Sequence, residues 1–244
     1  MWIKGQVDSY IPTLKVHNPR EITLVCDATF YAKRKDKIGT LVFKDTTRKD
    51  VLIWKHIQTE KVIEYKDLKQ QLLKLGYIIK SVTFDGKRGL TKLFKDYPVQ
   101  MCHFHQKKII QRYITKYPRL QAGKDLKKVM YNLTTTTEGR FTNKLDDWFR
   151  IYEDFTEELT VNPITGECFY KHQKLRAAYR SLRANLPYLF TYKNHKDLSI
   201  PNTTNNIDGG TFSPMKKLIN VHSGMSRELR FKLVDEYLAN YKKK

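Results

Sequence analysis

Two aspartates each follow an apolar run that is typical of a buried strand. Asp27 comes directly after Ile22–Cys26, and Asp85 comes directly after Ile78–Phe84. These short runs, rich in β-branched residues, predict strands. A carboxylate at the end of a buried strand is costly unless it is paired or binds a cation. The sequence therefore favours a divalent metal site, provided that the two strands are neighbours.

A third aspartate, Asp208, lies far along the chain, in Thr203–Gly210. It precedes the amphipathic run Phe212–Ile219, which predicts that Asp208 lies in or near the first turn of a helix. For each of the three aspartates alone, an ordinary turn or cap role remains open. Considered together, they favour a site that holds divalent metal.

The elements around these aspartates suggest how they meet. Strands at residues 22–26, 38–43 and 51–57, joined by short polar turns, predict an antiparallel meander. Tyr65–Leu75 has helical spacing and ends at Gly76, a residue typical of a helix C-terminus. A strand that follows such a helix is expected to run parallel to an earlier one. If residues 78–84 pair with the first strand, Asp27 and Asp85 become neighbours.

Further elements are expected downstream. A short helix at residues 90–97 and a strand at 99–102 precede a helix that starts near His105. Residues 120–200 contain three apolar stripes at helical spacing, so we expect a helical insertion rather than a long loop. Trp148 in the second stripe is expected in the core rather than as a wedge for a flipped base. The stripes are Leu126, Val129, Met130 and Leu133; Phe141, Leu145, Trp148, Phe149, Tyr152 and Phe155; and Leu175, Ala178, Tyr179, Leu182 and Leu186.

Three short motifs accompany the aspartates in order. Cys102–His105 has the form Cys-x-x-His, Thr203–Gly209 reads TTNNIDG, and His222–Ser226 reads HSGMS. With Asp27 and Asp85, this set resembles the DDE transposases, in particular the Mutator-like and related bacterial insertion-sequence group. The resemblance spans most of residues 20–235. It departs from that family at Asp208, where a glutamate is usual. Three interpretations stay open: Asp208 is a working third ligand, the chain is a decayed copy of a transposase, or Asp208 is misaligned with the family's third acid.

The resemblance implies an α/β fold, a ribonuclease-H-like mixed five-stranded sheet flanked by helices. It divides the chain into four segments. Residues 1–20 are expected to be a remnant of, or linker from, an N-terminal DNA-binding region. Residues 21–119 and 201–244 are expected to form the two parts of the catalytic domain, and residues 120–200 an all-helical insertion before the last catalytic helix.

The resemblance also implies a reaction. Two Mg²⁺ ions, replaceable by Mn²⁺ and about 3.5–4 Å apart, would be held by Asp27, Asp85 and Asp208 for DNA cleavage and strand transfer at transposable-element ends. Cys102, His105 and Asn205 are expected to support this site. A zinc site at Cys102 and His105 is disfavoured because no second ligand pair follows, and a simple helix-start role for His105 stays open.

The charge agrees with a nucleic-acid partner. The chain has 46 Lys plus Arg against 25 Asp plus Glu, a net charge of +21. Such an excess attracts phosphate backbones, although RNA, a ribosome or an anionic membrane surface would attract it too. The third insertion helix concentrates the expected DNA contacts. These are Lys171, Lys174, Arg176, Arg180 and Arg183, for each of which a solvated basic face is an equal alternative.

Partners and location follow from these expectations. We expect double-stranded element-end and target DNA, a homodimer or higher oligomer on DNA, and no membrane. A cytoplasmic, nucleoid-associated location is expected in a prokaryote and a nuclear one in a eukaryote. Three cysteines without framework spacing indicate reduced thiols. Two other functions stay open: a ribonuclease-H-like nuclease without strand transfer, and a truncated, non-catalytic DNA-binding relic.

Overall fold

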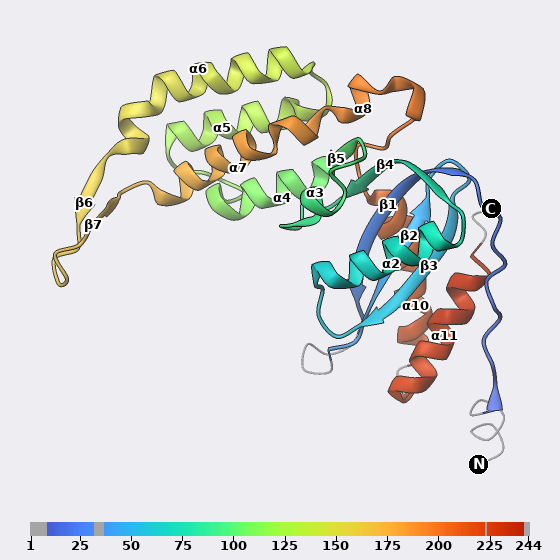
Figure 1. Cartoon of the computed structure of the whole chain (residues 1–244). Helices are drawn as coiled ribbons and strands as arrows, with labels where there is room; N and C mark the ends of the chain where they lie inside the picture. Colours follow the sequence, from blue (N-terminus) through green and yellow to red (C-terminus); the bar gives the residue numbers. More distant parts are fainter. Residues whose placement is uncertain (1–8, 32–36, 223, 242–244) are drawn as a thin grey trace.

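The computed structural model describes residues 9–31, 37–222 and 224–241. Residues 1–8 of the expected N-terminal remnant and Ser223 of the HSGMS motif lie outside the described residues. In Figure 1 the chain forms a sheet covered by helices and, beside it, a bundle of helices that ends in a hairpin. We call the first the sheet unit (residues 21–101 and 205–241) and the second the helical arm (residues 103–194).

The sheet unit has five strands in the order β3-β2-β1-β4-β5. The strands are β1 (Glu21–Phe30), β2 (Gly39–Asp45), β3 (Asp50–Ile57), β4 (Ile78–Phe84) and β5 (Val99–Met101). The predicted meander is confirmed, because β2 runs antiparallel to both β1 and β3. The predicted parallel pairing of β1 with β4 is also confirmed, and β5 continues it. The fold is thus α/β with a mixed five-stranded sheet.

Helices cover both faces of this sheet. On one face lie α2 (Val62–Lys74) and α3 (Leu90–Leu93), packed over buried side chains such as Phe43 and Phe84. On the other lie α10 (Ser213–Val221) and α11 (Arg227–Ala239), packed over Val25 and Val42. The expected helix at residues 90–97 is wrong in length, because a turn replaces it after Leu93. Gly76 follows the end of α2 with φ +88°, a conformation that suits glycine.

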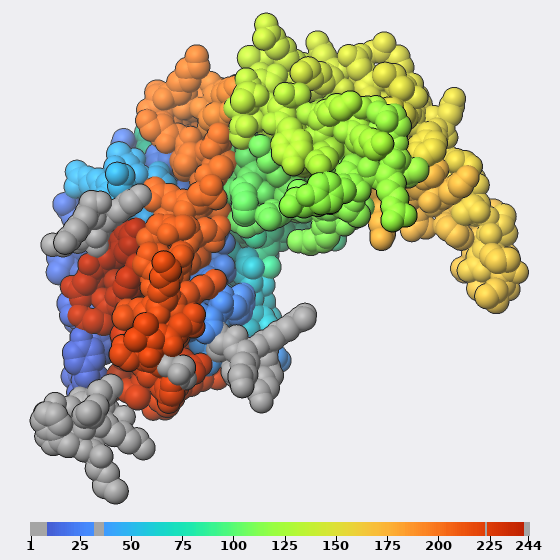
Figure 2. Space-filling view, turned by 180° about the vertical axis from the view of Figure 1, so that it is seen from behind, coloured from blue at the N-terminus to red at the C-terminus, as the bar shows by residue number. Residues whose placement is uncertain are grey.

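The helical arm has its own core. Its elements are α4 (His103–Ile114), α5 (Gln121–Tyr131), η2 (Asn132–Thr134), α6 (Glu138–Glu157), β6 (Leu159–Val161), β7 (Cys168–Tyr170), α7 (Gln173–Leu189) and α8 (Thr191–Asn194). Trp148 is buried there and donates its indole N–H to the Ala122 carbonyl, so its predicted core position is confirmed. From behind, the arm stands out as a separate lobe (Figure 2).

The expectation of an all-helical insertion is wrong for residues 159–170. Strands β6 and β7 form an antiparallel hairpin there, with Leu159 opposite Tyr170 and Val161 opposite Cys168. The physical reason is local: Pro163 and Gly166 (φ +70°) favour a turn, and the residues on either side prefer extended backbone. The hairpin forms the tip of the arm in Figure 1.

Among the described residues, no helix is both long and apolar enough to cross a membrane.

The chain returns to the sheet unit through η3 (Lys196–Leu198) and a helix in three parts. These parts are α9 (Asn205–Ile207), the π-helical turn η4 (Asp208–Phe212) and α10. Thr23 and Thr83 tie this return to the sheet, because their hydroxyls donate to the carbonyls of Leu198 and Pro201. The segment that carries Asp208 is thereby brought over the ends of β1 and β4.

Candidate active site

Asp27 and Asp85 lie side by side at one edge of the parallel pair β1 and β4. The last paired residues are Val25 and Thr83, so each aspartate stands two positions beyond the parallel ladder. The expectation that Asp27 ends its strand is wrong, however. β1 continues to Phe30 because its other neighbour β2 stays paired with it, with Asp27 opposite Val42. The adjacency predicted from the two apolar runs is nevertheless what the register gives.

Asp27 is the most buried of the three aspartates, with 6% of its surface exposed. Its Oδ1 accepts the backbone N–H of Ala28 at 2.8 Å, while its Oδ2 is buried without a hydrogen-bond partner among the described residues. Burial, followed by the charges of Asp208 and Asp85, raises the pKa of Asp27 well above its usual value; His105 opposes the rise. The charges of two carboxylates remote in sequence therefore act on Asp27 at this edge.

Asp85 is held by the turn that follows β4. Its Oδ1 accepts the backbone N–H of Lys87 at 2.9 Å. Between them, Gly86 has φ +87°, and a Cβ at this position would meet the side chain of Met101 at 2.3 Å. The left-handed backbone favours glycine here, and the flexible end of Met101 occupies the space that a Cβ would need. The residue after Asp85 is thus part of what directs its carboxylate.

Asp208 lies in the first turn of the returning helix, as the sequence predicted. The turn that it opens is π-helical, a form that is frequent at functional sites. One side chain links it to the rest of the edge: the hydroxyl of Thr204 lies 3.4 Å from Asp208 Oδ2 and 3.4 Å from His105 Nδ1. Thr204 is fully buried, and sequence reasoning did not assign it a role. Its place in the TTNNIDG segment, four residues before Asp208, was the available signal.

A buried lysine supports the same segment from behind, and the sequence analysis missed it. Lys44 extends from β2 and its ammonium group donates to the Asn206 carbonyl (3.1 Å), the Thr211 hydroxyl (3.1 Å) and the Tyr241 hydroxyl (3.2 Å). The same ammonium lies 4.5 Å from the centre of the Tyr241 ring. Because these bonds reach both sides of Asp208, Lys44 fixes the path of the turn that carries this carboxylate. A lysine directly after the apolar run Leu41–Phe43 was the only signal.

Cys102 and His105 also join the edge. Cys102 is buried, its Sγ accepts the Thr204 backbone N–H at 3.2 Å, and burial of its thiol is outweighed by hydrogen bonds from His105 and Thr204, which lower its pKa. The bond to Cys102, aided by the charges of Asp27 and Asp85, raises the pKa of His105 to about 9. His105 is therefore positively charged at neutral pH. Asn205, the third residue expected to support the site, begins α9 and is exposed.

The basic residues expected to bind DNA lie on β7–α7, at a distance along the arm from this edge, and most are paired with acids. Lys171 pairs with Glu158, Arg176 with Glu157, and Arg183 with Asp146 at 2.9 Å. Lys174 and Arg180 are exposed and form no ion pair within the part of the chain that the structure describes. The structure does not gather the five into one cluster with the aspartates.

The donor chemistry of the edge suits a hard cation. The aspartates offer carboxylate oxygens, and the unpartnered Oδ2 of Asp27 is a buried acceptor that a cation would satisfy. As placed, the described residues contain no group of three or more His, Cys, Asp and Glu side chains arranged to hold one ion. A Mg²⁺ ion usually takes only one or two carboxylates from the protein and completes its shell with water and phosphate. The edge thus supplies carboxylate oxygens of suitable chemistry but, as the described residues lie, no complete set of protein ligands for one ion.

The comparisons with known proteins add no family. The chain matches no family model and no curated protein.

Proposed function

We propose that this chain is the catalytic part of a DNA transposase, which cleaves DNA strands at element ends and joins them to target DNA. One observation carries the proposal: Asp27, Asp85 and Asp208, far apart in sequence, come near one another at one sheet edge, where Asp27 is buried with its Oδ2 unpartnered among the described residues. Burial and then the charges of Asp208 and Asp85 raise the pKa of Asp27. None of the three carboxylates forms a salt bridge with another described residue, although the net charge of the chain is +21, so a bound cation would offset their mutual repulsion.

The fold supports this reading. The order of elements and the mixed sheet β3-β2-β1-β4-β5 agree with the ribonuclease-H-like topology that the resemblance implies. In that arrangement the helical arm interrupts the sheet unit between β5 and the helix that carries the third acid. The position of Asp208 on the returning helix is therefore the position that the proposal requires of it.

Asp27, Asp85 and Asp208 would hold two Mg²⁺ ions, or Mn²⁺ in their place. When bound, such ions supply charge stabilisation to the scissile phosphate and make water or a 3′-hydroxyl a stronger nucleophile. The residues of the chain prepare for this in three ways. Asp27 keeps a buried oxygen unpartnered among the described residues, Thr204 connects Asp208 to His105, and the raised pKa of His105 favours a positive charge that would attract an anionic phosphate.

The central experiment compares wild-type protein with Asp27→Asn. Asparagine keeps the shape of the side chain but cannot offer two anionic oxygens. We expect magnesium-dependent nicking of a supercoiled plasmid to fall about a thousandfold or more, since metal stabilisation contributes several kcal/mol. The matched control is Asp154→Asn, an exposed aspartate on α6, which should leave nicking unchanged. Mg²⁺ should raise the unfolding temperature of the wild type and the control but not of Asp27→Asn.

A second substrate separates transposase from nuclease. A duplex with a pre-cut 3′ end is mixed with the plasmid, and joined products are measured on a gel. Joined products support strand transfer; nicking without joining assigns a nuclease that lacks strand transfer. If wild type and Asp27→Asn behave alike with Mg²⁺ and with Mn²⁺, catalysis at this edge is rejected and a DNA-binding relic remains.

A further inference from the structure

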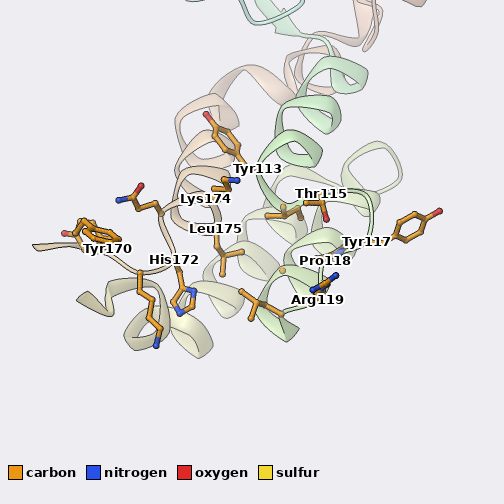
Figure 3. Close-up of a pocket in the computed structure, with 15 residues that line it drawn as sticks. Tyr113, Thr115, Tyr117, Pro118, Arg119, Tyr170, His172, Lys174 and Leu175 are labelled. Carbon is orange, nitrogen blue, oxygen red and sulfur yellow. The ribbon is translucent and has the colours of Figure 1, made fainter. Parts of the chain in front are cut away.

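A cavity of about 510 Å³ opens in the helical arm, away from the three aspartates. One wall is the end of α4 and the loop to α5, with Tyr113, Pro118 and Arg119; the other is β7 and the start of α7, with Tyr170 and Lys174 (Figure 3). The volume is within the range of small-ligand sites. The cavity is therefore large enough to take a small ligand or one unit of a polymer.

The lining combines aromatic rings with cations and holds no acid. Four of its fifteen residues are Tyr113, Tyr117, Phe169 and Tyr170, and three are Arg119, Lys171 and Lys174. Aspartate and glutamate are absent from this set. Two lining residues, Lys171 and His172, contact an acid outside the cavity, Glu158.

Two of the cations are available to an anion. Arg119 and Lys174 are exposed and, in the described ranges of the chain, neither forms an ion pair. On the rim, Tyr117 has 76% of its surface exposed, and the ammonium groups of Lys116 and Lys127 lie 5.3 and 5.5 Å from its ring centre. An exposed ring between cations is placed to stack a base while the cations meet the phosphates on either side of it.

Beyond Tyr117 a second hollow continues the same surface. It is lined by Tyr117 and Pro118 and further by Lys124, Lys127 and Tyr131. Tyr131 has 53% of its surface exposed, and Lys127 lies 5.5 Å from its ring centre as well. The two hollows share an edge and repeat one chemistry, an exposed tyrosine beside lysines. A repeating pattern of this kind suits a polymer of bases and phosphates.

The inner wall is rigid. The guanidinium of Arg176 lies 3.9 Å from the Tyr170 ring centre, and the His172 ring stacks on Phe155 at 3.7 Å. A ring held in this way loses little side-chain freedom when a base stacks on its other face. The cavity thus joins a fixed aromatic wall with a more exposed aromatic rim.

We propose that this cavity and its rim bind unpaired bases of single-stranded DNA by stacking, with Arg119 and Lys174 on the phosphates. The proposal rests on the proposed function in taking DNA as the substrate, and it adds a site that the aspartates do not provide. A duplex hides its base faces, whereas a strand end or a splayed base exposes them. The cavity therefore discriminates between unpaired and paired DNA.

The test measures binding of fluorescently labelled oligothymidylate to the full chain. The readout is fluorescence anisotropy, and EDTA is present so that no cleavage occurs. The comparison probe is an abasic oligomer of equal length and charge. Tyr117→Ala and Phe169→Ala, both at exposed positions, should each weaken oligothymidylate binding about five- to hundredfold. Binding of the abasic oligomer should stay unchanged, and Tyr117→Phe should retain the wild-type affinity.

Charge is tested separately. Lys174→Glu should weaken both oligomers and reduce the dependence of affinity on salt. Arg48→Glu makes the same charge change in the exposed turn between β2 and β3, and it should leave the preference for oligothymidylate over the abasic oligomer intact.

Three results would overturn the stacking site: equal binding of the two oligomers, aromatic variants with unchanged affinity, or equally tight binding of an acidic peptide of the same charge. Failure here while Asp27-dependent nicking persists removes only the cavity proposal. Stacking without any metal-dependent nicking removes the catalytic proposal instead and keeps the cavity.

Discussion

The aspartate edge of the sheet unit and the cavity of the helical arm are built from opposite chemistry. The edge gathers acids, of which Asp27 is only 6% exposed and the other two are partly buried, whereas the cavity exposes cations and rings, with Tyr117 at 76%. At the edge, strand register and a buried lysine fix each charge. Around the cavity, the Tyr170 ring packed against Arg176 forms an inner wall, and the rim around Tyr117 is more exposed.

This difference matches what each task requires. Charge that must act on a reacting phosphate is effective when it is held in place before the substrate arrives. A surface that binds a flexible strand gains more from exposed rings and cations that adjust to it. Because the aspartate edge and the cavity lie in different units, we expect substitutions in one unit to leave the structure and binding properties of the other unchanged.

The largest expected effect comes from the core of the arm. Trp148→Ala removes a buried indole that stacks near Tyr152 and Tyr179, and we expect a loss of about 3–5 kcal/mol in the free energy of unfolding. Urea unfolding followed by circular dichroism should show helix loss before the tryptophan fluorescence changes, which in a background that also carries Trp2→Phe comes from Trp54 in the sheet unit. Coincident transitions would instead make the two units one cooperative structure and contradict the comparison.

A smaller effect is expected behind the aspartate edge. Lys44→Met leaves the polar groups of Asn206, Thr211 and Tyr241 without their buried donor, which should cost about 1–3 kcal/mol. Magnesium-dependent nicking should fall further than stability explains, because the turn that carries Asp208 loses its support. The measurement is nicking at a temperature where the variant is fully folded, with the exposed Lys49→Met as control. Unchanged nicking would show that Asp208 is positioned without Lys44.

Lys44 also shows where sequence reasoning ends. Strong apolar runs predicted β1, β4 and their parallel pairing, because strand burial and crossover handedness are general physical constraints. The role of Lys44 depends on which side chains tertiary packing brings to its ammonium group, from residues 162 to 197 positions away. No local pattern contains that information.

The hairpin and the cavity were missed for a different reason. β6 and β7 have three residues each, too few for a periodicity to be recognised between two helices. Pro163 and Gly166 were the signal of a turn. The cavity combines the end of α4 with the start of α7, about sixty residues apart, and helical stripes predict what faces the core rather than what surrounds a hollow.

The pH dependence of stability gives a further contrast between the two units. Burial lowers the pKa of His103, at the base of the arm, to about 4, and its buried Nδ1 has no partner among the described residues. Between about pH 4 and 6.5, His103 is protonated in the unfolded state but neutral in the folded state. The contribution of His103 is therefore complete above pH 6.5 and is lost as pH falls toward 4, by up to about 1.4 kcal/mol per pH unit.

His103→Gln tests this prediction, since its amide can still donate toward the Leu189 carbonyl that His103 contacts at 2.6 Å. Urea midpoints measured from pH 7 downward should fall less steeply for the variant than for the wild type. Asp27 should show the opposite pH dependence. Because its pKa is raised in the folded state, the free energy of unfolding falls as pH rises above about 3.8, and Asp27→Asn should remove this loss of stability at neutral pH. Parallel slopes for wild type and His103→Gln would contradict the assignment.

The smallest effects are expected on the basic face of α7, where Arg180 forms no ion pair with another described residue and Arg183 pairs with Asp146 at 2.9 Å. Both are exposed, so either alanine substitution should change stability by less than about 1 kcal/mol. DNA affinity should separate them: Arg180→Ala should lower the slope of log affinity against log salt by about 1, because one phosphate contact is lost. Arg183→Ala should lower it by less, since Asp146 already neutralises that guanidinium. Equal slopes for the two variants would mean that DNA displaces Asp146 from Arg183. The helical arm would then offer more cations to phosphates than those that form no ion pair in the structure.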